Sequence, residues 1–212
     1  DCDGVFQEWG IKNWEKVDFT NDGLTDLLFI SYQYSYAPYA IVDNGDGSFK
    51  VHSLWRSSWE KCELAKSIKL NDKNHLKVYQ ARSKWNNAKD LLSLEAIEYK
   101  FIDTLTYKFD SFVELNDDPA NYKIEKIEFK SGPCDGTCPV FSLVLDTSGK
   151  VDFNGAYHVK FQGESSMNIG VDFFQELTSM LNYIRVKELE DDYQVTWTDD
   201  QTAFLTVTFA NG

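Results

Sequence analysis

Residues 26–36 read Asp-Leu-Leu-Phe-Ile-Ser-Tyr-Gln-Tyr-Ser-Tyr, and this stretch decides the class of fold. Its side chains alternate with a period of two, which is the period of a β-strand. The apolar and aromatic side chains on one face are Leu28, Ile30, Tyr32, Tyr34 and Tyr36, and Ser31, Gln33 and Ser35 lie on the other. The pattern predicts a strand that packs one face against a core.

Turn-forming residues flank this strand and recur along the chain. The segment Asn44-Gly45-Asp46-Gly47 separates strands predicted over 40–43 and 48–54, and such Gly-containing pairs favour tight hairpins. Further strands are predicted over residues 64–70, 75–81, 97–101, 105–113, 124–129, 140–145, 151–153, 193–198 and 203–209. The predicted fold class is α+β with β dominant, built from antiparallel sheets. Polar residues 116–121 predict a boundary between a β-rich domain over 1–116 and an α+β domain over 122–212.

One long amphipathic helix is predicted near the C-terminus, over residues 169–188. Apolar side chains recur there at helical spacing, and they are Phe173, Leu177, Met180, Leu181 and Ile184. Acidic Asp172 and Glu176 lie early, and basic Arg185 and Lys187 lie late, as the helix dipole favours. The strand over 203–209 is predicted to pack its apolar face, Leu205, Val207 and Phe209, against this helix.

The composition excludes several classes of function. The 212 residues contain 34 Asp and Glu against 21 Lys and Arg, a net charge of −13. Binding to a phosphate backbone or to an anionic membrane surface needs clustered cations, so a nucleic-acid or membrane-surface partner is not predicted. The longest apolar run is Leu27–Ile30, far below the roughly 18 residues of a membrane span.

Four cysteines permit disulfide bonds. Cys134 and Cys138 enclose a turn-forming segment, Asp-Gly-Thr, between Pro133 and Pro139, and a compact turn there brings the two sulfurs together. This pairing leaves Cys2 with Cys62. Free thiols, or a metal or redox site, are the alternatives. The chain begins Asp-Cys without Met, which favours an exported chain from which a signal peptide has been removed, with a lipid anchor on Cys2 as an option.

Oxygen-bearing residues gather over 18–26, in the order Asp-Phe-Thr-Asn-Asp-Gly-Leu-Thr-Asp. Alternate oxygens on a tight loop suit Ca²⁺, which takes 6–8 of them. The loop resembles the calcium loops of FG-GAP and VCBS-type repeats, in which an Asp-rich loop precedes an apolar strand. The resemblance implies metal ligands at Asp18, Thr20, Asp22, Leu24 (through its carbonyl) and Asp26. The alternative is a solvated turn whose aspartates bond their own backbone.

The second half carries a more specific motif. Residues 132–139 read Gly-Pro-Cys-Asp-Gly-Thr-Cys-Pro, after Ile124–Phe129 and before Gly149-Lys150-Val151, Asn154-Gly155 and the predicted helix. Over residues 122–212 the chain resembles a family of uncharacterised bacterial domains found mainly in exported envelope proteins. The resemblance implies a small α+β domain with the cysteines in a loop before a strand, and no established activity.

Aromatic side chains form a candidate binding surface, comprising Tyr32, Tyr34, Tyr36, Trp55 and Trp59. Glycan stacking is one role for such a surface, and packing in the core is the favoured one. Strand 203–209 contains no charged residue, so an added strand from another chain or another segment is predicted at its edge.

No catalytic motif stands out, and the chain is not predicted to be an enzyme. Its predicted function is a non-enzymatic, exported binding or assembly module of a bacterial envelope, in the periplasm or at the cell surface, with a protein partner and a calcium-stabilised loop. The alternative is an acidic inhibitor or immunity-type protein that binds a basic partner protein.

Overall fold

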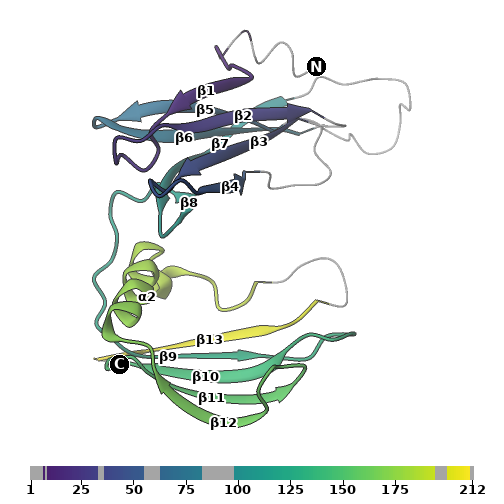
Figure 1. The fold of residues 1–212 in the computed structure, drawn as a ribbon, viewed down its shortest axis with the longest axis vertical. Helices are drawn as coiled ribbons and strands as arrows, with labels where there is room; N and C mark the ends of the chain where they lie inside the picture. The colour runs from purple at the N-terminus through teal and green to yellow at the C-terminus, as the bar shows by residue number, and fades with distance from the viewer. Residues whose placement is uncertain are drawn as a thin grey trace. The chain divides into compact units, whose positions relative to one another are not determined.

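The computed structural model describes residues 7, 9–32, 36–54, 63–82, 98–193 and 200–210. The chain forms two compact units, Asp1–Leu115 and Asn116–Gly212 (Figure 1). Both are built on antiparallel sheets, and in the described parts of the chain strands far outnumber helical segments. The predicted class, α+β with β dominant, is therefore confirmed. No helix in the described ranges is long and apolar enough to cross a membrane.

The first unit contains two four-stranded sheets, each with its strands in sequence order. The first sheet comprises β1 (Trp14–Val17), β2 (Asp26–Tyr32), β3 (Tyr36–Asp43) and β4 (Phe49–Ser53). The second comprises β5 (Glu63–Leu70), β6 (Lys73–Arg82), β7 (Glu98–Lys108) and β8 (Ser111–Glu114). The Asn44–Gly47 turn joins β3 to β4, with Gly45 and Gly47 at positive φ that other residues rarely adopt.

The core of the first unit lies between the two sheets. Its buried side chains come from both sheets and from the loops beside them: Phe19, Leu28, Ala40, Leu54, Ala65, Leu76, Val78 and Leu105. Leu28 belongs to the face of β2 that was predicted to pack inward, and it is 1% exposed. The alternation therefore gives the inner face of β2, but the predicted single strand over 26–36 was wrong: β2 ends at Tyr32, and Tyr36 begins β3, which pairs with β2 in antiparallel orientation.

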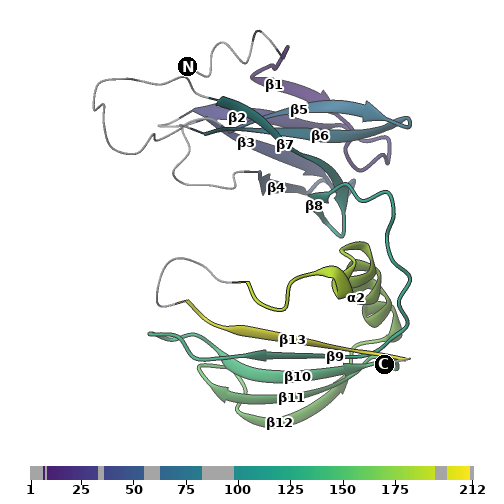
Figure 2. The same cartoon turned by 180° about the vertical axis from the view of Figure 1, so that it is seen from behind.

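The second unit is one five-stranded sheet with a helix on one face, as the two opposite views agree (Figures 1 and 2). The strands run in the order β12-β11-β10-β9-β13. Their bounds are β9 (Ile124–Ser131), β10 (Val140–Asp146), β11 (Lys150–Tyr157), β12 (Gly163–Asn168) and β13 (Ala203–Phe209). The helix is α2 (Val171–Tyr183), followed by a 3₁₀ turn, η1 (Val186–Glu188). The predicted strand over 193–198 lies almost wholly outside the described residues.

Helix α2 is shorter than the predicted span of 169–188, and its core-facing side differs in one respect. Gly170 has φ 93° before it and Arg185 has φ 53° after it, so regular helix cannot continue through either position. Phe174, Leu177 and Leu181 pack against the sheet, whereas Phe173 is 47% and Ile184 is 41% exposed. The prediction that Phe173 and Ile184 belong to the buried face was wrong, because Phe174 takes that place in the first turn.

The segment predicted as the domain boundary, 116–121, is hydrogen-bonded to the end of α2. The backbone N–H of Asn116 donates to the Tyr183 hydroxyl at 2.8 Å, and the Ala120 N–H donates to the Asn182 carbonyl at 3.0 Å. Arg185 adds an ion pair with Asp118 at 2.7 Å. These residues therefore form part of the second unit.

Candidate functional site

The Asp18 carboxylate holds the acidic loop between β1 and β2 together by accepting hydrogen bonds from other residues of the loop. One carboxylate oxygen accepts the Thr20 hydroxyl and the Asp22 N–H, both at 3.2 Å, and the other accepts the Gly23 N–H at 2.9 Å. Asp22 in turn accepts the Leu24 N–H at 2.7 Å. This is the pattern of aspartates that fold a turn around their own side chains.

Asp26 serves a different purpose from the other two aspartates. Its side chain is 1% exposed, and its two carboxylate oxygens accept the N–H groups of Phe19 at 2.7 Å and of Asp43 at 2.9 Å. The carboxylate therefore ties the start of the loop to the end of β3, 17 residues along the chain. A buried carboxylate is stable here because both oxygens are hydrogen-bonded.

The predicted calcium ligands are brought together only in part. The oxygens of Asp18, Thr20 and Asp22 lie in one turn, while Asp26 is committed to backbone groups. Within the described residues, no group of three or more His, Cys, Asp or Glu side chains is placed to hold a metal ion. Calcium at this loop stays a prediction.

The outer face of the first sheet carries a cluster of apolar side chains, with Lys16, Asp43 and Ser53 on the same face around it, although this face does not line the core. Strand register places Trp14 beside Phe29 and Phe29 beside Tyr39, and it places Leu27 beside Ile41 and Ile41 beside Val51. Phe49 on β4 lies on the same face. Trp14, Phe49 and Val51 are each at least 60% exposed. Antiparallel sheets with one face in water usually carry polar side chains there, so this face has the character of an interface.

This outer face was not predicted from the sequence, although a signal for it exists. Leu27–Ile30 and Tyr39–Val42 are unbroken apolar runs, rather than alternating ones. Such runs are typical of strands with both faces covered. The runs belong to β2 and β3, the two central strands of the sheet.

The predicted aromatic surface is described only in part. Tyr32 and Tyr36 face each other at the end of the β2–β3 hairpin, with ring centroids 4.8 Å apart, and Tyr32 is 67% exposed. Tyr34, Trp55 and Trp59 lie outside the described residues, as do Cys2 and Cys62. The described aromatic side chains that spread across a face are instead Trp14, Phe29, Tyr39 and Phe49.

A small polar cluster joins the two sheets of the first unit. Lys50 on β4 forms an ion pair with Asp110, in the turn between β7 and β8, and Asp110 also accepts the Tyr107 hydroxyl at 2.7 Å. The hydrogen bond from Lys50 lowers the pKa of Asp110, and burial lowers the pKa of the neighbouring His52. His52 packs edge-on against Tyr107 and Phe112. These contacts hold the first sheet against the second.

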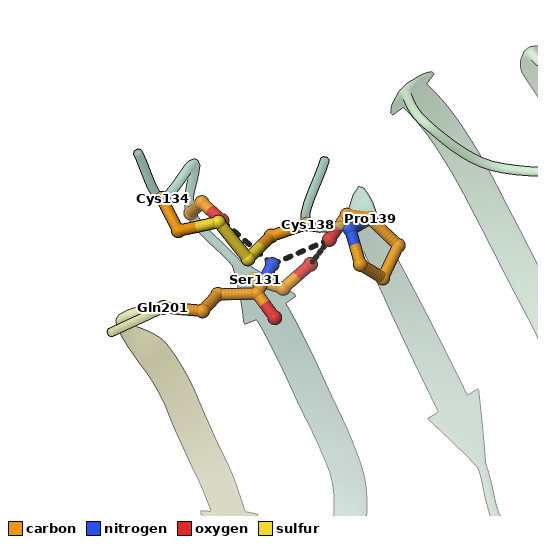
Figure 3. Close-up of a disulfide and its surroundings, with 6 residues drawn as sticks. Ser131, Cys134, Cys138, Pro139 and Gln201 are labelled. Carbon is orange, nitrogen blue, oxygen red and sulfur yellow. Dashed lines mark hydrogen bonds between the residues drawn. A yellow bond between two sulfur atoms is a disulfide. The ribbon is translucent and has the colours of Figure 1, made fainter. Parts of the chain in front are cut away.

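In the second unit, a disulfide joins Cys134 to Cys138 between β9 and β10, with their Cα atoms 5.7 Å apart (Figure 3). The hydroxyl of buried Ser131 donates a hydrogen bond to the Pro139 carbonyl at 2.8 Å. Gln201, just before β13, donates to the carbonyls of Gly132 and Pro139 at 2.8 and 2.6 Å. The loop is therefore fixed both by the bridge and by its hydrogen bonds to β9 and β13.

Loss of this bridge is expected to destabilise the second unit by about 2 kcal/mol, the loop-closure value for five residues. The paired Cys134→Ser and Cys138→Ser variant should show this loss in chemical denaturation of the full chain. Peptide mapping of unreduced, alkylated protein checks the bridge itself. Alkylation of both cysteines, in protein never exposed to reductant, would show that the bridge is absent.

The comparisons with known proteins match the second unit only. A family described as Domain of unknown function (DUF6438) matches residues 125–212, which contain nearly all of the sheet, α2 and the disulfide. No curated protein and no solved structure matches the chain.

Proposed function

We propose that the chain is a non-enzymatic, exported binding and assembly module of a bacterial envelope, acting in the periplasm or at the cell surface. The observation that carries this proposal is the apolar outer face of the β1–β4 sheet. In a partner-free protein, exposed Trp14, Phe49 and Val51 would lose the free energy that apolar side chains gain by burial, about 25 cal/mol per Å². A protein surface that covers this face would recover it.

The geometry of this face favours a protein partner over a glycan. A sugar stacks on the open face of an aromatic ring, whereas the rings of Phe29 and Tyr39 are stacked on each other at 5.3 Å with only 15° between their planes. The remaining side chains of the face are aliphatic in part, as in the core of a protein interface. The net charge of −13 supports the absence of a nucleic-acid partner.

The disulfide supports export over the alternative proposal, a cytosolic acidic inhibitor of a basic protein. Structural disulfides persist in oxidising compartments, whereas cytosolic thiols are kept reduced. The Cys134–Cys138 bridge is an integral part of the loop between β9 and β10. Both proposals share a protein partner, and they differ in the redox state of these two cysteines.

The paired variant Phe49→Thr and Val51→Thr tests the proposed interface. Both side chains are more than 60% exposed and Thr suits a strand, so the stability of the full chain should change by less than about 0.5 kcal/mol. On native electrophoresis of extracts from the cells that produce the protein, we expect the original chain to run in a complex of higher mass and the variant to run outside it. The matched control, Lys69→Ser in the second sheet, should stay in the complex. Equal recovery of both variants would contradict the proposal.

Calcium binding at the Asp18–Asp26 loop is part of the same proposal. The ion would draw on the oxygens of the turn itself and would brace the loop beside β2. A ligand that binds only the folded state at 100 times its Kd stabilises it by about 2.7 kcal/mol. We therefore expect the melting temperature of the chain to be higher in millimolar calcium than in chelator, and the rise to vanish in Asp22→Asn. An identical melting temperature in both conditions would reject calcium.

A further inference from the structure

Strand β13 forms one edge of the five-stranded sheet. It pairs with β9 along its whole length, from Ala203 opposite Ser131 to Phe209 opposite Ile124, and no described strand lies on its other side. Every second backbone N–H and C=O of an edge strand points away from the sheet. These groups form a row of donors and acceptors whose complement is an extended strand.

The two edge strands of this sheet differ in composition, and only β13 is suited to pairing with an added strand. The opposite edge, β12, reads Gly-Glu-Ser-Ser-Met-Asn, with an exposed charge and weak β-formers, which discourages pairing with another chain. β13 reads Ala-Phe-Leu-Thr-Val-Thr-Phe, with strong β-formers and neither charge nor proline. The protein thus carries the usual protection on one edge and lacks it on the other.

An apolar row of side chains runs across the sheet to this edge. Register places Leu205 beside Phe129, Phe129 beside Leu143, and Leu143 beside Phe153. The row ends at Leu205, which is 52% exposed, although Val207 and Phe209 on the same face pack into the core. An added strand would place its own inward side chain next to Leu205 and continue the row.

The edge is held in place before anything binds. Gly132 donates to the Thr202 carbonyl at 2.7 Å at one end of β13, and Ala210 donates to the Lys123 carbonyl at 2.9 Å at the other. Gln201 fastens the start of the strand to the disulfide loop (Figure 3). Because the strand is already ordered, binding does not have to order it, which favours affinity.

The acidic charge of the second unit favours a basic strand as the binding partner of β13. Residues 116–212 carry 16 Asp and Glu against 7 Lys and Arg. Several of the acidic side chains precede β13 and are exposed: Glu190, Asp191, Asp192 and Asp200. A basic segment is attracted to this unit, and a second copy of the same acidic unit is repelled.

We propose that the edge of β13 on which no described strand lies binds an extended strand of a protein partner, with apolar side chains at alternate positions and Lys or Arg at its C-terminal end. Antiparallel addition matches the rest of the sheet, and it brings the C-terminal end of the bound strand to the start of β13, near Asp200. The proposal rests on the proposed binding function, since it names a second contact through which the same module takes its partner.

A labelled synthetic peptide of alternating Thr and Val, ending in two Lys, tests the edge on the full chain. We expect hydrogen exchange of the amides of 203–209 to slow when the peptide is present. Leu205→Lys, which puts a charge into the apolar row at the edge, should weaken peptide binding at least tenfold. Met167→Lys on β12, which is 56% exposed before substitution, is the matched control and should bind as the original chain does.

Backbone recognition is tested by a peptide with the same side chains but with N-methyl groups at alternate amides, which should not bind. Three results would overturn the proposal: equal binding of the N-methylated peptide, protection that falls on β12, or full protection of 203–209 in the monomer without peptide. The last would place another segment of the chain on this edge. None of these results touches the outer face of the first sheet, so they are distinct from a failure of the proposed function.

Discussion

Asp26→Ala is expected to destabilise the first unit by about 3–5 kcal/mol. The carboxylate is 1% exposed and accepts the N–H groups of Phe19 and Asp43. Truncation leaves the Phe19 N–H without a partner at a buried position and the Asp43 N–H without one at a part-buried position. Each such group costs about 1–3 kcal/mol, so the expected loss lies near the middle of the combined range of about 2–6 kcal/mol. Urea titration with hydrogen-exchange readout of β2 and β3 measures the first unit separately within the full chain.

Asp46→Ala is the matched control for this prediction. Asp46 also accepts a backbone N–H, that of Ser48 at 2.8 Å, but in the exposed turn between β3 and β4. Water can replace the carboxylate there, so the loss should stay below about 1 kcal/mol. Asp26→Asn should fall between the two, because the amide offers one acceptor oxygen for two donors. Losses of equal size at Asp26 and Asp46 would show that the Asp26 carboxylate does not join the loop to β3.

Phe174→Ala is expected to cost the second unit about 3–5 kcal/mol, the range for removing a buried Phe side chain. Phe174 is 6% exposed and packs with Ile127, Leu145 and Leu181 between α2 and the sheet. Hydrogen exchange of the α2 and β10 amides under increasing urea measures the change.

Its neighbour supplies the control. Phe173 is 47% exposed, and Ala favours helix more than Phe does, so Phe173→Ala should change the stability by less than about 1 kcal/mol. The two substitutions remove the same atoms one residue apart. If Phe173→Ala proved the more damaging, the helix would present the other side to the sheet, as the spacing of Phe173, Leu177 and Leu181 had suggested.

Most strands of this fold were predicted from the sequence, because their signals are local. Strands β1 and β12 were not predicted, and the predicted strand over 105–113 was wrong, because a turn at Phe109 and Asp110 separates β7 from β8 there. The Asn44–Gly47 turn and the alternation from Leu28 to Tyr32 depend on neighbours in the chain, and the β3–β4 hairpin and β2 follow them. The helix was also predicted, but two adjacent phenylalanines both fit its apolar stripe. Packing against Ile127 and Leu145, far away in the chain, selects Phe174.

The candidate sites were harder to predict, because they depend on which way a side chain turns. The spacing over 18–26 supplies oxygens for a metal, yet the direction of Asp26 is set by the N–H of Asp43, on another strand. The outer face of the first sheet was hidden because Trp14, Phe29 and Val51 come from three separate strands that only the register brings side by side. The edge strand β13 was easier to predict, because the absence of charged residues and proline in this strand can be read from the sequence alone.

Site-specific photo-cross-linking in the cells that produce the protein tests most directly whether the outer face of the first sheet binds another protein. A photoreactive phenylalanine analogue at Val51 lies on the apolar outer face of the first sheet, and the same analogue at Lys69 lies in the second sheet as a control. We expect one discrete adduct of the chain with another protein from position 51 and none from position 69. No adduct from position 51, or the same adducts from both positions, would contradict it.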